Sequence, residues 1–180
     1  MRNRGQQHRQ KGHVRRLIGL VAVLVMALCL TSGFVHAGEV TLQEQKGAYA
    51  VKIDGELFAR YIYKGYPKPI VYPIIGPTGT KVVRDYPMKQ QENEAHDHPH
   101  HKSMWYAQDK VNGVRFWGEE GRIVQAEVLS TSSSDGEASL TTKNWWVGPD
   151  SEIKCSDTRT VTFRSLPGDV RAIDWRRGTP

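Results

Sequence analysis

Cysteine is scarce in this chain of 180 residues, which contains only Cys29 and Cys155. Cys29 lies in an apolar N-terminal run, so residues 38–180 retain a single thiol. One thiol cannot close an intramolecular disulfide. We therefore expect the fold to depend on an apolar core, with no covalent cross-link to support it.

A surplus of charge of one sign is also missing from most of the chain. The sequence has 25 Lys and Arg against 19 Asp and Glu, but six of the basic residues and none of the acidic ones lie in residues 1–16. Twenty-five less six leaves 19 basic and 19 acidic residues in residues 38–180, which are formally neutral. This balance gives no reason to expect nucleic acid or an anionic membrane surface as a partner.

Long apolar runs are limited to residues 17–30, LIGLVAVLVMALCL, which lie between the basic segment and TSGFVHA. This order is typical of an export signal, and the small residues Val35 and Ala37 predict cleavage before Gly38. We expect residues 1–37 to be a helical signal peptide and the mature protein to be periplasmic or extracellular. The alternative is a retained membrane anchor, although a membrane span needs about 20 apolar residues.

Internal repeats and sustained helical periodicity are absent from residues 38–180, where short alternating runs are separated by turn residues. About nine or ten such runs predict an all-β antiparallel sandwich, of the supersandwich kind, as one domain. Asp54-Gly55 is a strong hairpin signal, and Pro73 indicates a sheet edge or a bulge. The expected strands span 48–53, 56–63, 69–75, 81–88, 102–107, 113–118, 122–133, 139–148, 159–166 and 170–175.

The last predicted strand, VRAIDW, is followed at once by RRGTP. A strand in this place leaves a sheet edge that has to be paired or protected. We consider two explanations: the strand pairs with an earlier one, or residues 38–180 are the N-terminal portion of a larger, truncated β domain.

Residues 94–107, EAHDHPHHKSMWYA, contain all four histidines of residues 38–180. In an extended segment His96, His98 and His100 would project from one face about 6.5–7 Å apart, and Pro99 favours that conformation at His98. Imidazole suits transition metals such as Zn, Cu or Fe. A structural zinc site has four ligands, so a further ligand would have to come from elsewhere, with Glu94, Asp109 and Glu119 as candidates.

A second interpretation of the cluster needs no metal. Histidine titrates near neutral pH and serves as a general acid or base, so we identify His98, His100 and His101, together with Glu119, as candidate catalytic residues. A third interpretation is a polar cap on a loop without chemistry, in which Glu119 is a solvated charge. No Ser-His-Asp signature, phosphate-binding loop or dinucleotide fingerprint is present in the sequence.

The aromatic residues that follow the histidines have two possible roles. Trp105 and Trp117 are expected to contribute to the core, but one of them, if it faces a cleft, would stack on the apolar face of a sugar. Asn112-Gly113 is first of all a turn signal, and Asn112 is kept with the two tryptophans as a candidate substrate-binding residue.

Several segments together resemble the PmoA-like family of exported bacterial proteins. They are KPIVYPIIGPTGTKVVRDYPM, DHPHHKSMWYAQDKVNGVRFWGE, the WWVGPD turn and DTRTVTFRSLPGDVRAIDW, and they cover residues 57–175 approximately. Family members continue into further β-strands after the last segment, so the resemblance implies that this chain is the N-terminal portion of a larger domain. It also ties His98, His100 and His101 to the family pattern, while His96 lies just outside it.

The resemblance implies a role around carbohydrates, because family members resemble exported proteins encoded beside sugar-oxidoreductase-like and glycoside-processing proteins. We therefore expect a carbohydrate-associated enzyme whose histidine cluster performs acid/base or metal-assisted chemistry on a small-molecule or carbohydrate ligand. One alternative is a non-catalytic carbohydrate-binding or scaffold module. The other is a metal-dependent oxygenase of the methane type, as the family name implies.

Overall fold

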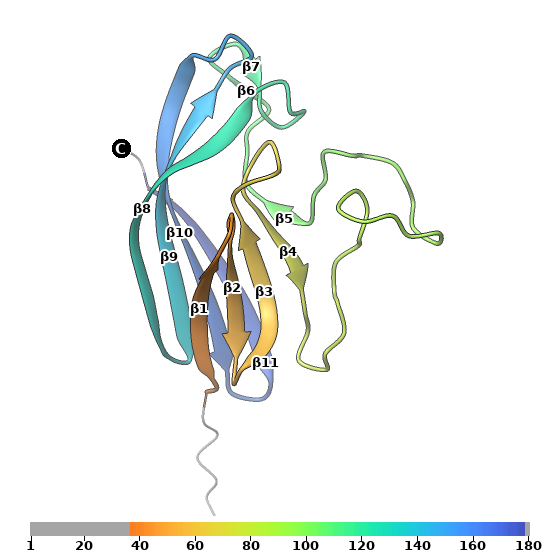
Figure 1. The fold of residues 1–180 in the computed structure, drawn as a ribbon, viewed down its shortest axis with the longest axis vertical. Helices are drawn as coiled ribbons and strands as arrows, with labels where there is room; N and C mark the ends of the chain where they lie inside the picture. Colours follow the sequence, from red (N-terminus) through yellow and green to blue (C-terminus); the bar gives the residue numbers. More distant parts are fainter. Residues whose placement is uncertain (1–36, 179–180) are drawn as a thin grey trace, which may run out of the picture. The chain divides into compact units, whose positions relative to one another are not determined.

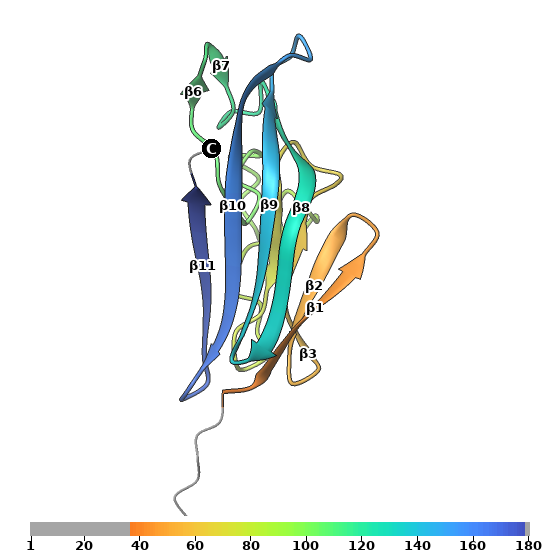
Figure 2. The same cartoon turned by 90° about the vertical axis from the view of Figure 1, so that its left-hand side faces the viewer.

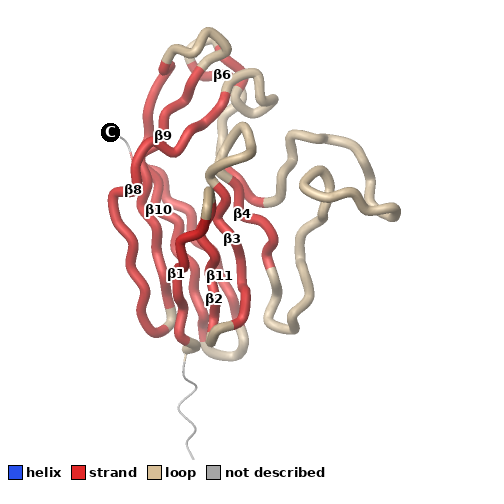
Figure 3. The backbone as a smooth tube through the Cα atoms, in the orientation of Figure 1, coloured by secondary structure: helices blue, strands red, loops and turns tan. Residues whose placement is uncertain are grey.

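The structure, a computed structural model, describes residues 37–178, so the predicted helical signal peptide lies outside the described residues except for Ala37. Every regular element in this part of the chain is a β-strand, and no helix occurs in it (Figure 3). Residues 37–178 accordingly contain no helix that is long and apolar enough to cross a membrane. The prediction of an all-β fold is confirmed.

Eleven strands make up the described part of the chain (Figure 1). They are β1 (Glu39–Gln45), β2 (Ala48–Ile53), β3 (Glu56–Ile62), β4 (Ile70–Ile74), β5 (Met104–Trp105), β6 (Lys110–Val111), β7 (Val114–Arg115), β8 (Arg122–Asp135), β9 (Glu137–Val147), β10 (Ile153–Leu166) and β11 (Val170–Gly178).

Nine of these strands form one antiparallel sheet in the order β11-β10-β9-β8-β1-β2-β3-β4-β5, and β6 and β7 form a separate hairpin. The large sheet curls so that its two halves face each other across a shared core (Figures 1 and 2). Phe58 of β3 meets Phe163 of β10 edge to face, with ring centroids 6.1 Å apart. Tyr61 of β3 lies 6.3 Å from the ring of Trp175 in β11. The predicted sandwich is thus built from one folded sheet.

The sheet turns back on itself between β1 and β8. These strands pair only at Glu39–Asp135 and Val40–Ser134 and then diverge, as Figure 2 shows. On its other side β8 pairs with β9 along its length. The short β1–β8 ladder therefore acts as the corner that places one half of the sheet over the other.

Strand β9 shows how the sequence fills the interior. Its buried residues alternate along the strand, as the period of two of a β-strand requires. Ala138 and Leu140 bury apolar side chains, whereas Thr142 and Asn144 are polar and equally buried. Trp146 follows in the same row. Along β9 the interior thus changes from apolar side chains at Ala138 and Leu140 to hydrogen-bonded ones at Asn144 and Trp146.

Two hairpin turns agree with the sequence signals. Asp54 and Gly55 have φ angles of 50° and 82° between β2 and β3, and Asn112 and Gly113 have φ angles of 48° and 88° between β6 and β7. Positive φ at both central residues is the type I′ geometry, which fits the twist of antiparallel strands.

The main difference from the predicted strands is at residues 81–88. This segment makes one isolated bridge, between Ile75 and Lys81, and otherwise belongs to a long loop between β4 and β5 (Figure 3). The strands β1 and β6 were not predicted. Pro73 lies inside β4, where the ladder to β3 has a register irregularity, so the expected bulge is present.

Candidate functional site

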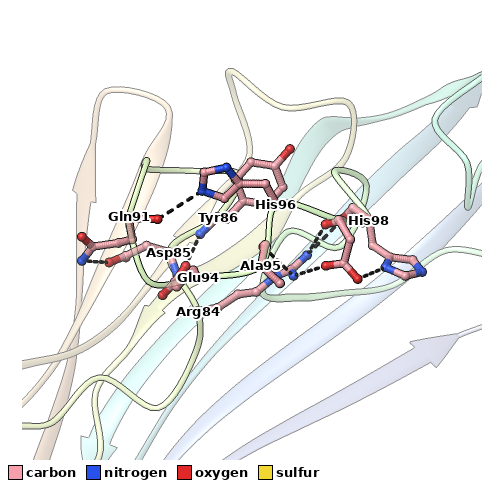
Figure 4. Close-up of polar contacts among 9 residues, drawn as sticks. Arg84, Asp85, Tyr86, Gln91, Glu94, Ala95, His96 and His98 are labelled. Carbon is pink, nitrogen blue, oxygen red and sulfur yellow. Dashed lines mark hydrogen bonds and ion pairs between the residues drawn. The ribbon is translucent and has the colours of Figure 1, made fainter.

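The carboxylate of Glu94 holds the first half of the loop between β4 and β5 together. Glu94 accepts hydrogen bonds of 2.7–2.9 Å from the backbone N–H groups of Asp85 and Tyr86 (Figure 4), and these bonds lower the pKa of Glu94. Asp85 is buried, and the hydrogen bonds that it accepts from Lys81 and Tyr72 lower its pKa to about 2. Backbone groups that would join a ladder in a strand are bound here by side chains, which explains why residues 81–88 form a loop.

A guanidinium group holds the second half of the loop. Arg84 donates to the carboxylate of Asp97 at 3.0 Å, to the backbone oxygen of Asp97 at 3.0 Å and to that of His98 at 3.1 Å (Figure 4). The other carboxylate oxygen of Asp97 lies 2.7 Å from Nδ1 of His98. His98 is thereby fixed with a φ of 47°.

The extended row expected for His96, His98 and His100 is not formed. The segment is a loop with a turn at His100, and His98 has a left-handed backbone. His96 points elsewhere: its ring stacks on Tyr86 at 4.7 Å and its Nε2 lies 3.1 Å from the backbone oxygen of Gln91 (Figure 4). The correction separates His96 from the other histidines.

His98, His100 and His101 form a compact cluster of imidazoles. The ring centroids are 5.9 Å apart for His98 and His100, 4.9 Å for His98 and His101, and 4.4 Å for His100 and His101. The left-handed residue at His98 folds the chain so that three nearly consecutive side chains meet. We name this set the imidazole cluster.

Two tryptophans adjoin the imidazole cluster. The ring of His101 lies 6.2 Å from that of Trp105 in β5 and 6.0 Å from that of Trp117, which follows β7. The two indoles are 4.5 Å apart and inclined by 66°. Trp117 is 43% exposed, whereas Trp105 is partly buried. Trp117 therefore offers an aromatic surface to a ligand, and Trp105 supports it.

A carboxylate between two ammonium groups lies next to the tryptophans. Lys68 Nζ donates to Glu119 Oε1 at 2.8 Å, and Lys102 Nζ donates to Oε2 at 2.6 Å. Lys68 is 2% exposed, and its Nζ lies 4.2 Å from the ring centroid of Trp105. Burial lowers the pKa of Lys68, and the hydrogen bond to Glu119 opposes that change. Glu119 is thus bound on both oxygens, which suits a charge that positions its neighbours.

The surroundings of His101 lower its pKa. Burial is the first cause that lowers its pKa, and the charges of His100, His98 and Arg84 lower it further, whereas Asp97 raises it by less. A histidine in these surroundings favours the neutral form, which accepts a proton.

The histidines are not arranged as the ligands of a metal ion in the part of the chain that the structure describes. Among residues 37–178 no group of three or more His, Cys, Asp and Glu side chains is arranged to hold a metal ion. His96 makes its contacts away from His98 and His100, and His98 already shares Nδ1 with Asp97. Among the described residues, the donors of this site therefore do not fit a transition-metal centre.

Asn112 has a structural role in a turn. It is the first central residue of the β6–β7 turn, and its side-chain amide donates to the backbone oxygen of Lys154 at 2.6 Å. Within the described residues it makes no hydrogen bond to the imidazole cluster. The turn signal accounts for this residue.

The tryptophan side of the site is anchored to the core. Asp157 and Arg159 of β10 form a fully buried ion pair of 2.8 Å, and Arg159 Nη1 donates to the backbone oxygen of Tyr106 at 3.3 Å. The Arg159 guanidinium also lies 5.0 Å from the ring of Tyr106. The residue beside Trp105 is therefore held by the interior of the opposite half of the sheet.

Beside Glu119 is an open cavity of about 300 Å³. It is lined by Pro67, Glu119, Glu120, Gly121, Arg122, Gly148, Pro149 and Ser151. Glu119 thus connects the lysine and tryptophan side of the site to a space of the size of a small molecule.

The structure brings together six of the ten residues that the sequence identified, namely His98, His100, His101, Trp105, Trp117 and Glu119. Glu94 binds the backbone of Asp85 and Tyr86, and Asp109 pairs with Arg115, so neither joins them. Asn112 and His96 also lie outside this group. Sequence reasoning missed Lys68 and Lys102. Lys102 follows the histidines directly, but nothing in the sequence indicates that Lys68 is buried against Glu119.

No curated protein and no solved structure matches this chain. A family model does match, over residues 48–177, which include every strand from β2 to β10 and most of β11. The matched range contains the imidazole cluster, both tryptophans and the Lys68–Glu119–Lys102 contacts. The chain belongs to this family, which is described as a family of unknown function (DUF6807).

Proposed function

We propose that the protein is a carbohydrate-associated enzyme that performs acid/base chemistry at the imidazole cluster. The observation that carries the proposal is the position of His101, which lies between a second imidazole and the exposed indole of Trp117. An aromatic surface can pack against the apolar face of a sugar, and an imidazole beside it is placed to transfer protons to or from that sugar. The resemblance to PmoA-like proteins, which are associated with carbohydrate-processing proteins, supports the same class of ligand.

In this proposal His101 is the general base, because its surroundings lower its pKa and keep it neutral. His100, whose ring is 4.4 Å away, is placed to exchange a proton with the same ligand. Glu119 has a positioning role, since both its oxygens are bound by ammonium groups. It fixes Lys102, the residue directly after His101, and thereby the end of the loop.

Turnover of a panel of oligosaccharides by the purified protein tests the proposal, with products separated by chromatography. His100→Ala and His101→Ala are each expected to reduce turnover by at least about 100-fold. His96→Ala is the matched control, because His96 stacks on Tyr86 away from the cluster. Unchanged turnover in both variants would remove the imidazole cluster from the mechanism.

A non-catalytic carbohydrate-binding module is a second candidate, favoured by the 43% exposure of Trp117. This function predicts glycan binding without turnover, and loss of binding in Trp117→Ala with little effect of His101→Ala. The third candidate, a metal-dependent oxygenase, is the activity that the PmoA name implies. Stoichiometric copper or iron in the purified protein would support it, and the donor geometry described above gives no support.

A further inference from the structure

We propose that the sugar recognised at this site carries a negatively charged group, a carboxylate or a sulfate, and that His100 and His101 bind that group. This inference rests on the proposed carbohydrate function and adds the class of sugar.

The fixed charges around the imidazole cluster do not cancel. Lys68 and Lys102 share the single carboxylate of Glu119, and Arg84 is paired with Asp97. Three cationic side chains therefore face two carboxylates, and one positive charge is left over before any histidine is protonated. A surplus of positive charge among partly buried side chains attracts anionic ligands.

One imidazole of the cluster is hydrogen-bonded within the protein, and the other two are available to a ligand. His98 is bound to Asp97 through Nδ1. Within residues 37–178 no hydrogen bond is found for the rings of His100 and His101, although both residues are partly exposed. Their centroids are 4.4 Å apart and their planes are inclined by 79°. A neutral imidazole has one N–H donor and one acceptor nitrogen, so each ring can donate to an oxygen of one anionic group and still keep a nitrogen that accepts a proton.

The field at His101 supports the same sign of charge. The guanidinium of Arg84 and, where they carry a proton, the imidazoles of His98 and His100 lower the pKa of His101, whereas the carboxylate of Asp97 raises it by less. A neutral sugar would leave this positive charge without compensation. A carboxylate or sulfate would compensate it through charge-assisted hydrogen bonds, which are stronger than neutral ones.

The exposed indole of Trp117 sets where the sugar ring lies. Trp117 is 6.0 Å from His101, with the two rings nearly perpendicular. A sugar ring stacked on Trp117 therefore has its substituents beside His101. A charged substituent on the ring, such as the C6 carboxylate of a uronic acid, then reaches the imidazole cluster.

The test compares each ligand with a partner that differs only in charge. The purified full chain is applied to immobilised uronate-containing polysaccharides and to the same polysaccharides after reduction of the carboxyl groups to alcohols. Sulfated polysaccharides and their desulfated forms make a second pair. We expect at least one charged form to bind about tenfold or more tightly than its neutral partner. We also expect this preference to decrease as salt is raised from 0.05 to about 0.5 M.

A variant pair completes the test. His101→Gln is expected to bring the ratio of charged to neutral binding close to one, whereas His96→Gln keeps it. Equal binding of the charged and neutral partners overturns this inference but leaves the proposed carbohydrate function intact. Absence of binding and turnover with every glycan overturns both. Preference for uronates or for sulfates alone identifies which anionic group is recognised.

Discussion

The buried ion pair of β10 makes a quantitative prediction about what holds the site in place. The side chains of Asp157 and Arg159 are both fully buried. We expect Asp157→Asn to lower the free energy of unfolding by about 3–5 kcal/mol, because breaking a buried pair leaves one charge without compensation. Here the uncompensated charge is the guanidinium of Arg159.

The magnitude follows from the partners that Asp157 satisfies. Its carboxylate accepts from Asn144 at 3.1 Å, from the indole N–H of Trp146 at 2.8 Å, and from three Arg159 contacts of 2.8–3.0 Å. An asparagine offers one oxygen and turns an NH₂ group towards the remaining donors. The matched control is Asp109→Asn, which breaks the exposed ion pair with Arg115 and is expected to cost about 0–1 kcal/mol.

Urea unfolding followed by tryptophan fluorescence measures both variants against the parent protein. The double variant Asp157→Leu with Arg159→Met is expected to be more stable than Asp157→Asn, because it leaves neither charge buried. A loss below about 1 kcal/mol in Asp157→Asn, equal to that of the exposed control, would refute this reasoning about the uncompensated guanidinium. It would show that water or another group compensates Arg159.

Three further predictions concern packing, acid and the site carboxylate. A Cβ on Gly121 would lie 2.6 Å from the ring of Phe116. Gly121→Ala is therefore expected to lower the free energy of unfolding in urea by about 1–3 kcal/mol. Gly118→Ala is the control and should be nearly neutral, because a Cβ there meets nothing within 4 Å. Asp85 has a pKa of about 2 in the fold against an ordinary 3.8. The stabilisation that its carboxylate contributes is therefore complete above pH 4 and is lost as the pH falls towards 2. The free energy of unfolding of Asp85→Asn should depend less on pH in that range than that of the parent protein. Glu119→Gln leaves two ammonium groups without their carboxylate and is expected to cost about 1–3 kcal/mol by thermal unfolding, together with a loss of glycan binding.

Most of the strands could be predicted from the sequence because each carries its own local signal. The run AYAVKI coincides with β2, and the Asp54-Gly55 turn supplies the positive φ angles that a type I′ hairpin requires. The polar run of β1 has no comparable signal, and its place is fixed by pairing with β2. The segment 81–88 reads as a strand, but Glu94 binds its backbone N–H groups, a contact between residues eight and nine positions apart.

The site was predicted less completely, for a physical reason. Composition identifies histidines and tryptophans, but it does not reveal which of them meet. The row of His96, His98 and His100 depended on an extended backbone, and the left-handed φ of His98 removes it and brings His101 into the cluster instead. Lys68 is 51 positions from Glu119, so no local pattern could indicate their contact.

A chain of contacts connects the buried ion pair of β10 to the proposed site. Arg159 is neutralised by Asp157 and donates to the backbone oxygen of Tyr106. The preceding residue in the chain is Trp105, and the ammonium of Lys68 lies 4.2 Å from the centroid of its ring. Lys68 in turn binds the carboxylate of Glu119. The effect of losing the Asp157 charge is therefore expected to reach Trp105 through its peptide bond to Tyr106 and to weaken glycan binding, although no residue of the imidazole cluster is altered. If Asp157→Asn loses stability but keeps its glycan binding, the core and the site are independent of each other. If this variant loses glycan binding together with stability, the fold interior sets the geometry of the aromatic surface.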